Sequence, residues 1–226
     1  MELNLKQVAA AKAVEYVQSG MVLGLGTGST TRYATEMIGE RIRDGRLHDI
    51  VGVPTSSATE KLAKEVGIPL TTLKDHPGLD LTIDGADEVD PDLTLIKGLG
   101  GALLYEKIVA RASRQEIIIV DESKLVQVLG TRSPLPVEVI PFGWGTYMDA
   151  LRRFGCEPAL RLLGTQPYVT DEGNYILDCF YDGIDLPREL TVSIHMIPGV
   201  VEDGLFLGLA RTVVVASLDQ VRVLER

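Results

Sequence analysis

The first 120 residues of this chain alternate between short apolar runs and longer segments with helical spacing. The predicted strands and helices are, in chain order, 21–26, 29–42, 50–53, 56–66, 79–83, 102–110 and 116–120. Strands that alternate with helices form a parallel sheet with helices on both of its faces. We therefore predict an α/β fold for this part of the chain. Ligands of such sheets bind where loops converge at the carboxyl ends of the strands.

The pattern changes after Gly130, where four prolines follow within 30 residues. We predict a main domain over 1–130 and 205–226, and a smaller α+β domain over 131–204. In the smaller domain, two helices over 146–154 and 187–195 would lie on an antiparallel sheet. Its predicted strands are 137–140, 159–162 and 175–179. Two later segments, 200–211 and 212–216, are predicted to be strands that return to the main sheet.

Composition indicates a globular protein with a small-molecule ligand. The chain of 226 residues is long enough to bury a core without disulfides or metals. Its net charge of −10 argues against binding to nucleic acid, which requires clustered Lys and Arg. An amphipathic stretch over 3–17 follows Met1, and no apolar run is long enough to cross a membrane. Cys156 and Cys179, without metal-ligand spacing, are typical of a reducing compartment, so we predict a cytoplasmic protein.

The glycine-rich loop over 24–31 joins the first strand to the first long helix. The dinucleotide fingerprint GxGxxG would require glycine where Ser29 stands, and the Walker pattern lacks its lysine. Thr27, Gly28, Ser29 and Thr30 nevertheless offer hydroxyl and backbone N–H groups at a helix N-terminus. Such a turn can bind a single phosphate. The alternative is that Ser29 only caps the helix.

An acidic loop follows the strand over 79–83, with four carboxylates in the seven residues 84–90. Carboxylates this close can bind a metal, accept hydrogen bonds from sugar hydroxyls, or act as acid and base. The spacing does not fit a calcium loop, and a magnesium site has no supporting motif, so we predict no metal. We interpret Asp84 and Asp87 as functional, and Glu88 and Asp90 as a solvated turn.

The stretch over 97–107 combines a lysine, a glycine-rich turn and a carboxylate. Lys97 precedes Gly98, Leu99, Gly100 and Gly101, and Glu106 comes about one turn into the helix that follows. A base beside an anion-binding turn indicates proton transfer on a phosphorylated or carboxylated substrate. A helix-capping loop with a solvated Glu–Lys pair is the alternative. Lys124, at the end of another strand, could reach the same crevice, but taken alone it is typical of a surface lysine.

Taken together, the motifs resemble those of ribose-5-phosphate isomerase, type A. They are, in chain order, 26–30, 84–88, 97–107, 122–124, 137–143 and 197–206. The resemblance implies a cofactor-free enzyme of the pentose phosphate pathway that interconverts ribose 5-phosphate and ribulose 5-phosphate. It also implies a Rossmann-like parallel sheet with a small ferredoxin-like α+β domain, and a homodimer or a pair of dimers. Two positions depart from the family pattern, which often has glycine where Leu99 stands and arginine where Tyr105 stands.

The resemblance also implies a role for each site residue. Its base falls on Glu106, its aspartates on Asp84 and Asp87, and its lysines on Lys97 and Lys124. The predicted substrate-binding residues are Thr27, Gly28, Ser29, Thr30, Asp84, Gly85, Ala86, Asp87, Lys97, Gly98, Leu99, Gly100 and Lys124.

We predict that Asp84 or Asp87 assists ring opening and that Glu106, partly buried, shuttles the proton between C1 and C2. Lys97 and nearby N–H groups would stabilise the enediolate, while Ser29, Thr30 and Lys124 would hold the phosphate. Two other functions remain open, a non-catalytic domain that senses sugar phosphates and an acyl-CoA transferase with a glutamate nucleophile. Unlike a sensor of the regulator type, this chain shows no DNA-binding appendage.

Overall fold

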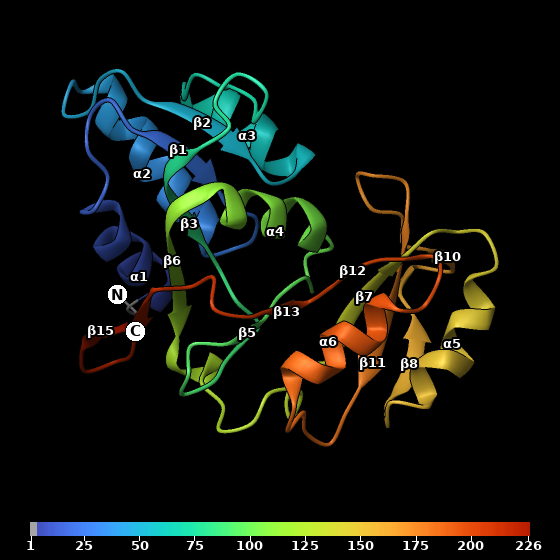
Figure 1. Ribbon diagram of the computed structural model, residues 1–226. Coiled ribbons are helices and arrows are strands. Elements are labelled where there is room, and N and C mark those ends of the chain that lie inside the picture. Colours follow the sequence, from blue (N-terminus) through green and yellow to red (C-terminus); the bar gives the residue numbers. More distant parts are fainter. Residues whose placement is uncertain (1–3) are drawn as a thin grey trace. The chain divides into compact units, whose positions relative to one another are not determined.

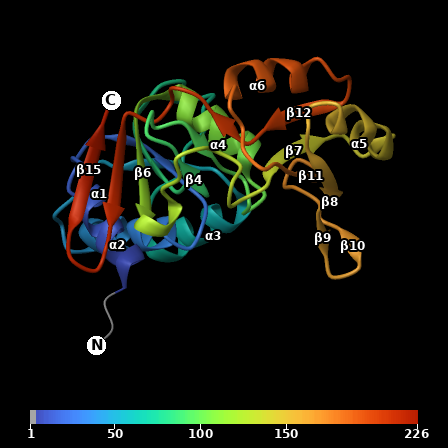
Figure 2. The same cartoon turned by 90° about the horizontal axis from the view of Figure 1, so that it is seen from below.

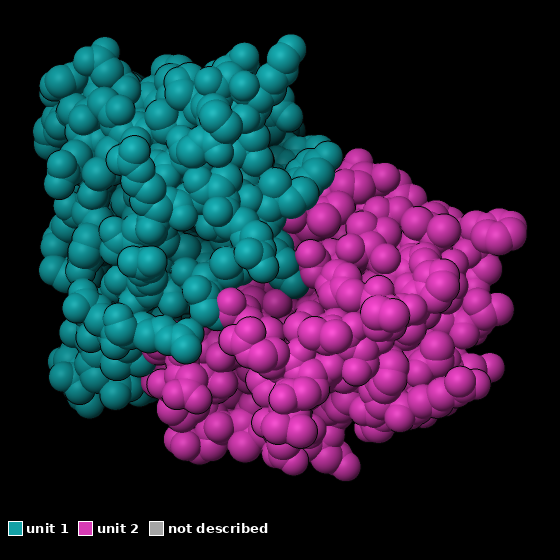
Figure 3. Space-filling model, in the orientation of Figure 1, with its two compact units in different colours: residues 1–86, 105–124, 208–226 teal, residues 87–104, 125–207 magenta. Residues whose placement is uncertain are grey.

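The computed structural model describes residues 4–226, and the start of the predicted amphipathic stretch at residue 3 lies outside them. The chain divides into two compact units (Figure 3). Unit 1 comprises residues 1–86, 105–124 and 208–226, and unit 2 comprises residues 87–104 and 125–207. Unit 2 thus includes residues 87–104, which the sequence analysis assigned to the main domain. These units are compact clusters of residues, not parts shown to fold alone, so the domain boundaries drawn from the sequence stay a prediction.

Unit 1 is built on a six-stranded sheet with the strand order β15-β14-β6-β3-β1-β2 (Figure 1). Its strands are β1 (Val22–Leu25), β2 (Val51–Pro54), β3 (Leu79–Asp84), β6 (Ser113–Asp121), β14 (Thr212–Ala216) and β15 (Val221–Glu225). All neighbours are parallel except β15, which pairs with β14 in the antiparallel sense. The predicted parallel sheet is confirmed. Strand β15 was not predicted, because its largely exposed residues carry no buried face.

Helices cover both faces of this sheet. They are α1 (Leu5–Val14), α2 (Thr31–Arg43), α3 (Ser57–Val66) and α4 (Leu103–Ala112). Helices α1, α2 and α3 bury their apolar residues in one core together with Leu23 and Leu81 of the strands. On the opposite face, α4 packs so closely on β1 that a Cβ atom at Gly24 would lie 2.6 Å from Val109.

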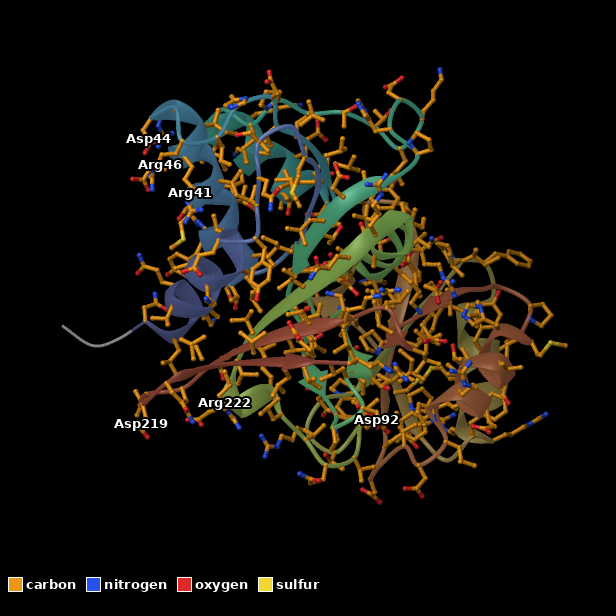
Figure 4. The ribbon with its side chains drawn as sticks, turned by 60° about the vertical axis from the view of Figure 1, so that its left-hand side comes forward. Arg41, Asp44, Arg46, Asp92, Asp219 and Arg222 are labelled. Atoms are coloured by element: carbon orange, nitrogen blue, oxygen red, sulfur yellow. The ribbon has the colours of Figure 1, made fainter. Side chains whose placement is uncertain are left out.

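Local signals explain where the helices of unit 1 begin and end. The hydroxyl of Ser56 accepts a hydrogen bond from the N–H of Thr59, and Gly67 ends α3 in the left-handed conformation. Arg41 of α2 donates to the carbonyl of Val14 at the end of α1 over 2.9 Å; Arg41, Asp44 and Arg46 are labelled in Figure 4. No helix among residues 4–226 is long and apolar enough to span a membrane.

Unit 2 contains a four-stranded antiparallel sheet with the order β12-β7-β11-β8. Its strands are β7 (Leu135–Val139), β8 (Glu157–Leu160), β11 (Tyr175–Phe180) and β12 (Val200–Asp203). Helices α5 (Trp144–Arg152) and α6 (Pro187–His195) share its apolar core, which confirms the predicted α+β arrangement.

Short strands complete unit 2. A hairpin of β9 (Leu162–Leu163) and β10 (Gln166–Pro167) projects on the side away from α6 (Figure 2). Strands β4 (Glu88–Val89), β5 (Leu95–Ile96) and β13 (Leu205–Phe206) form a separate three-stranded sheet.

The prediction that residues 200–211 return to the main sheet is wrong. Strand β12 pairs with β7, and β13 pairs with β5. Of residues 200–216, only 212–216 join the main sheet, as β14. The connection from α6 to β12 covers just residues 196–199, so the strand is held beside the sheet on which α6 packs.

Candidate active site

Asp84 ends β3 and is fully buried in unit 1. Its Oδ1 atom accepts hydrogen bonds from the N–H of Gly85 (2.7 Å) and from the N–H of Thr27 (3.2 Å). The loop after β1 can come this close to Asp84 because residue 26 is a glycine. A Cβ atom at Gly26 would lie only 2.3 Å from the same oxygen. The structure therefore joins the glycine-rich loop to the first of the two predicted aspartates.

Glu106 lies on α4, in the face of the helix that packs against the sheet. Its side chain is 3 % exposed, more buried than the sequence analysis expected. Val109, one turn later on the same helix face, lies against Gly24. Because side chains alternate along a strand, Thr82 and Asp84 share a face of β3. A Cβ at Gly24 would contact both Thr82 and Val109, so Asp84 projects from the same sheet face that α4 covers.

The predicted phosphate loop gains a lysine that the sequence analysis did not select. The Nζ atom of Lys6 on α1 donates to Oγ of Ser29 over 2.8 Å. Ser29 does not cap α2, since Thr30 occupies the cap position and makes no capping hydrogen bond through its side chain. In the sequence, Lys6 is one of several charges on an amphipathic helix. Only the packing of α1 beside α2 shows which of them reaches the loop.

Thr27 has a different role from its neighbours in the loop. Its hydroxyl lies 2.7 Å from that of Thr55, 2.8 Å from that of Ser56 and 3.1 Å from that of Thr59. This hydroxyl cluster links the β1 loop to the start of α3. The Thr27 hydroxyl therefore connects two parts of unit 1.

Lys124 ends a short 3-10 helix (Glu122–Lys124) and is half-buried in unit 1.

In unit 2, Lys97 follows β5 and is 2 % exposed. Its ammonium lies 5.3 Å from the centroid of the Phe206 ring, a cation–π contact that suits a desolvated lysine. Asp87 accepts a hydrogen bond from the N–H of Leu99 over 2.9 Å. The second predicted aspartate therefore holds the glycine-rich turn that follows Lys97.

The turn over 98–101 requires glycine at two positions. Gly98 has φ +104° and Gly101 has φ +82°, a region that other residues rarely adopt. Leu99 does not have a positive φ, so its side chain is compatible with the turn and points to an exposed position. Tyr105, the second departure from the family pattern, is also exposed.

Glu88 does not belong to a solvated turn, and that interpretation is wrong. The side chain is completely buried in unit 2. Its carboxylate accepts hydrogen bonds from the N–H groups of Gly130 (2.6 Å), Arg132 (2.7 Å) and Ser133 (2.5 Å). Asp90 accepts from the N–H groups of Asp92 and Thr94, and its partial burial raises the pKa of its carboxyl group. Both carboxylates therefore hold backbone N–H groups in place.

His195 joins an acidic pair that its place in the sequence did not indicate. Its Nε2 atom lies 3.0 Å from Glu202 and 3.3 Å from Asp203, both on β12. The hydrogen bond to Asp203 raises the pKa of His195. Among residues 4–226 these are the three side chains close enough together to share a metal ion. The contacts of His195 with the two carboxylates link α6 to β12.

The chain was compared with known protein families and proteins. The family described as Ribose 5-phosphate isomerase A (phosphoriboisomerase A) matches residues 51–220. The chain belongs to this family. The ribose-5-phosphate isomerase A of Gloeobacter violaceus is 55 % identical over 226 residues, 99 % of this chain and 97 % of that one. The ribose-5-phosphate isomerase A of Roseiflexus castenholzii is 53 % identical over 96 % of this chain and 93 % of its own length.

Solved structures of the family have the same fold. The ribose 5-phosphate isomerase of Plasmodium falciparum superposes with a TM-score of 0.96, at 43 % identity over 98 % of each chain. The ribose 5-phosphate isomerase A of Methanocaldococcus jannaschii gives a TM-score of 0.93, also at 43 % identity over 98 % of each chain. These likenesses confirm the Rossmann-like fold with its smaller α+β part that the sequence motifs of the ribose-5-phosphate isomerase A family imply.

Proposed function

We infer that this protein is an aldose–ketose isomerase that interconverts D-ribose 5-phosphate and D-ribulose 5-phosphate, a step of the non-oxidative pentose phosphate pathway. The observation that carries this conclusion is the buried Glu106 on α4, the helix that covers the sheet face bearing Asp84, in a chain of the ribose-5-phosphate isomerase A family. The reaction moves one proton between adjacent carbons and is redox-neutral. We therefore propose that it proceeds without a cofactor or metal.

Glu106 is the proposed general base. Its carboxylate takes the proton from C2 of the open-chain aldose and forms an enediolate, then returns that proton to C1. The proton of the C2 hydroxyl passes to the aldehyde oxygen, so the aldehyde oxygen becomes a hydroxyl and the C2 oxygen becomes the carbonyl. A carboxylate held on a helix and shielded from water suits this transfer, because its position is defined and bulk solvent does not compete for the proton.

Asp84 and Asp87 differ in what holds them, and this bears on ring opening. Asp84 is fully buried and its Oδ1 atom is engaged with backbone N–H groups. Asp87 is half-buried and holds the Leu99 N–H through Oδ2. We propose that one of these carboxylates assists ring opening by taking the proton of the C1 hydroxyl as the bond between C1 and the ring oxygen breaks; the ring oxygen gains a proton and becomes the C4 hydroxyl. Lys97 is proposed to stabilise the enediolate, since a desolvated ammonium interacts strongly with negative charge that develops nearby.

The substrate phosphate is proposed to bind at the loop that precedes α2. Ser29 and Thr30 stand at the N-terminus of this helix, where backbone N–H groups and the helix dipole favour an anion. Lys6 adds a positive charge within hydrogen-bond distance of Ser29. Lys124 is a further candidate for this role. A few such local charges can outweigh the net charge of −10, which is screened beyond about 8 Å at physiological salt.

A solved relative supports the enediolate mechanism. A D-ribose-5-phosphate isomerase that is 41 % identical over 99 % of this chain was solved in complex with phospho-erythronic acid. The carboxylate of that acid is planar and carries a delocalised negative charge, as the enediolate does. We propose that the same compound inhibits this protein by occupying the same groups.

The test follows ketopentose formation from ribose 5-phosphate with EDTA present. The wild-type protein should turn over, and Glu106→Gln should lose turnover while still binding substrate. Glu65→Gln, at an exposed glutamate of α3, is the matched control and should leave kcat unchanged. Binding of ribose 5-phosphate without turnover in the wild type would favour the sugar-phosphate sensor. Near-normal turnover by Glu106→Gln would refute the base assignment, and inhibition by EDTA would point to a metal at the aspartates.

We also propose that the protein works in the cytoplasm as a homodimer or a pair of dimers. Its two cysteines are free and buried, which suits a reducing compartment. The family resemblance supports the oligomer. Light scattering coupled to size-exclusion chromatography would measure the mass of the particle, and a monomer at micromolar concentration would contradict the proposal.

A further inference from the structure

The glycine-rich turn over 98–101 is held by an arginine from another part of unit 2. Arg161 lies between β8 and β9, and its side chain is 12 % exposed. Its Nη1 atom donates to the carbonyl of Gly98 over 2.9 Å and to the carbonyl of Leu99 over 3.1 Å. One guanidinium nitrogen thus bridges two successive carbonyl groups of the turn.

Asp178 on β11 holds the other edge of the same guanidinium. Its two carboxylate oxygens accept hydrogen bonds from Nε (2.9 Å) and from Nη2 of Arg161. Strands β8 and β11 are paired, with Ala159 opposite Asp178. The N–H of Arg161, directly after β8, donates to the carbonyl of Ile176 on β11 over 2.9 Å, so both residues are held by the same pair of strands. This bidentate geometry requires the planar fork of arginine, because a lysine ammonium cannot hold both carboxylate oxygens and two carbonyls at once.

The contact with Leu99 determines where the next N–H group points. In a trans peptide, the C=O and N–H bonds point in opposite directions, so the group between Leu99 and Gly100 can turn only as a unit. When Arg161 holds the Leu99 carbonyl, the N–H of Gly100 is directed away from Arg161. The neighbouring N–H groups are occupied, that of Leu99 by Asp87 and that of Gly101 by the Gly98 carbonyl (2.9 Å). In the part of the chain that the structure describes, the Gly100 N–H has no partner.

Tyr168 supports the far side of the same turn. Its hydroxyl lies 3.4 Å from the carbonyl of Gly100. The ring lies so close to Gly101 that an added Cβ there would be 2.2 Å from the hydroxyl oxygen. The guanidinium carbon of Arg161 is 5.9 Å from the centroid of this ring, so the two side chains brace each other. The carbonyls of Gly98, Leu99 and Gly100 therefore each face a side-chain donor, from Arg161 directly after β8 or from Tyr168 directly after β10.

We propose that Arg161, oriented by Asp178, is a positioning residue for the isomerisation. It fixes the turn so that the Gly100 N–H is presented as a hydrogen-bond donor to an oxygen of the enediolate. This inference rests on the proposed isomerase function. It explains why a largely buried ion pair is built where its guanidinium holds two backbone carbonyls of the turn. A donor directed in advance needs no reorganisation as the negative charge develops.

The test compares Arg161→Met and Arg161→Lys with Arg152→Met. Arg152 is the matched control, because it forms ion pairs with Asp149 and Glu157 at the surface of α5 and does not contact the turn. For Arg161→Met we expect kcat to fall on the order of 10- to 100-fold with a much smaller change in KM. The loss should be below the roughly 10²- to 10³-fold effect of deleting such a donor, since the N–H remains but is no longer directed. Arg161→Lys should recover part of kcat.

Inhibition by phospho-erythronic acid gives a second readout that a purely structural role would not move. Its inhibition constant should rise by about the same factor as kcat falls, because both report binding of the anionic oxygens. If Arg161→Met does not fold, Asp178→Asn tests the same hypothesis. This variant keeps Arg161 and the shape of the Asp178 side chain but removes the carboxylate that orients the guanidinium. The proposal is overturned if the folded variants match Arg152→Met in kcat, or if only KM changes. Absence of turnover in the wild type would instead refute the isomerase function.

Discussion

Replacing Gly26 by alanine tests whether the position of Asp84 matters for catalysis. Gly26 needs no left-handed backbone, so the substitution introduces one methyl group and no conformational strain of that kind. The new Cβ would lie 2.3 Å from Oδ1 and 2.5 Å from Cγ of Asp84, and 2.6 Å from the carbonyl oxygen of Ile83. The aspartate and the end of β3 must therefore move away from the loop.

The size of the effect follows from these distances. Ordinary carbon–oxygen contacts lie near 3.5 Å, so the Asp84 carboxylate has to retreat by about 1 Å. A displacement of about 1 Å in a catalytic constellation costs roughly 10²-fold in rate. Overpacking of this kind destabilises a core by about 1–3 kcal/mol. For a chain of this size each kcal/mol lowers Tm by about 2–4 °C, which predicts a decrease of roughly 2–12 °C.

The assay measures kcat for ribose 5-phosphate at 25 °C, with circular dichroism to establish the folded fraction and a thermal scan for Tm. Gly78→Ala is the control, because nothing lies within 4 Å of its added Cβ and its backbone is not left-handed. The control should keep wild-type kcat and Tm. If folded Gly26→Ala retains the kcat of Gly78→Ala, the placement of Asp84 against the β1 loop is not what catalysis requires, and the reasoning fails.

Two further predictions concern unit 2. Glu88→Gln leaves at least one of the N–H groups of Gly130, Arg132 and Ser133 without its acceptor, which should cost about 1.5–3 kcal/mol; a urea midpoint equal to that of the wild type would contradict this. The pKa of His195 is raised by its hydrogen bond to Asp203, so the protonated form stabilises the folded state. That contribution is fully present below the unfolded pKa of about 6.5 and is lost as pH rises through the higher folded pKa. The Tm advantage of the wild type over His195→Gln should therefore be largest at about pH 6 and shrink in alkaline buffer, and a constant difference across pH would count against the ion pair.

Regular elements of the main sheet could be predicted because their signals are local. Strand β3 and helix α3 were expected within one residue of their observed bounds, since an apolar run and a capped periodic helix each carry their own pattern. Strands β4, β5 and β13 have two residues each, too few to show a period. They exist only because distant segments pair with one another. The misplaced return of residues 200–203 has the same cause.

The candidate site residues were selected from local patterns. Asp84 directly follows a predicted strand, and Lys97 and Glu106 stand on either side of a glycine-rich turn that begins a predicted helix; their catalytic roles stay a prediction. Lys6 was missed, because a charge on an amphipathic helix does not reveal which loop it will reach. Glu88 was misjudged, because its burial depends on N–H groups more than forty residues away.

The sequence by itself determined the class of fold, the family and the loops where the chemistry is expected. Periodicity and glycine placement are properties of neighbouring residues and survive without any knowledge of packing. Only the tertiary structure decided which partner each polar group received, such as Asp87 for the Leu99 N–H and Arg161 for the two carbonyls of the turn. Hydrogen bonds act over about 3 Å. Residues 62 and 63 positions apart come within that distance only after the strands between them have paired.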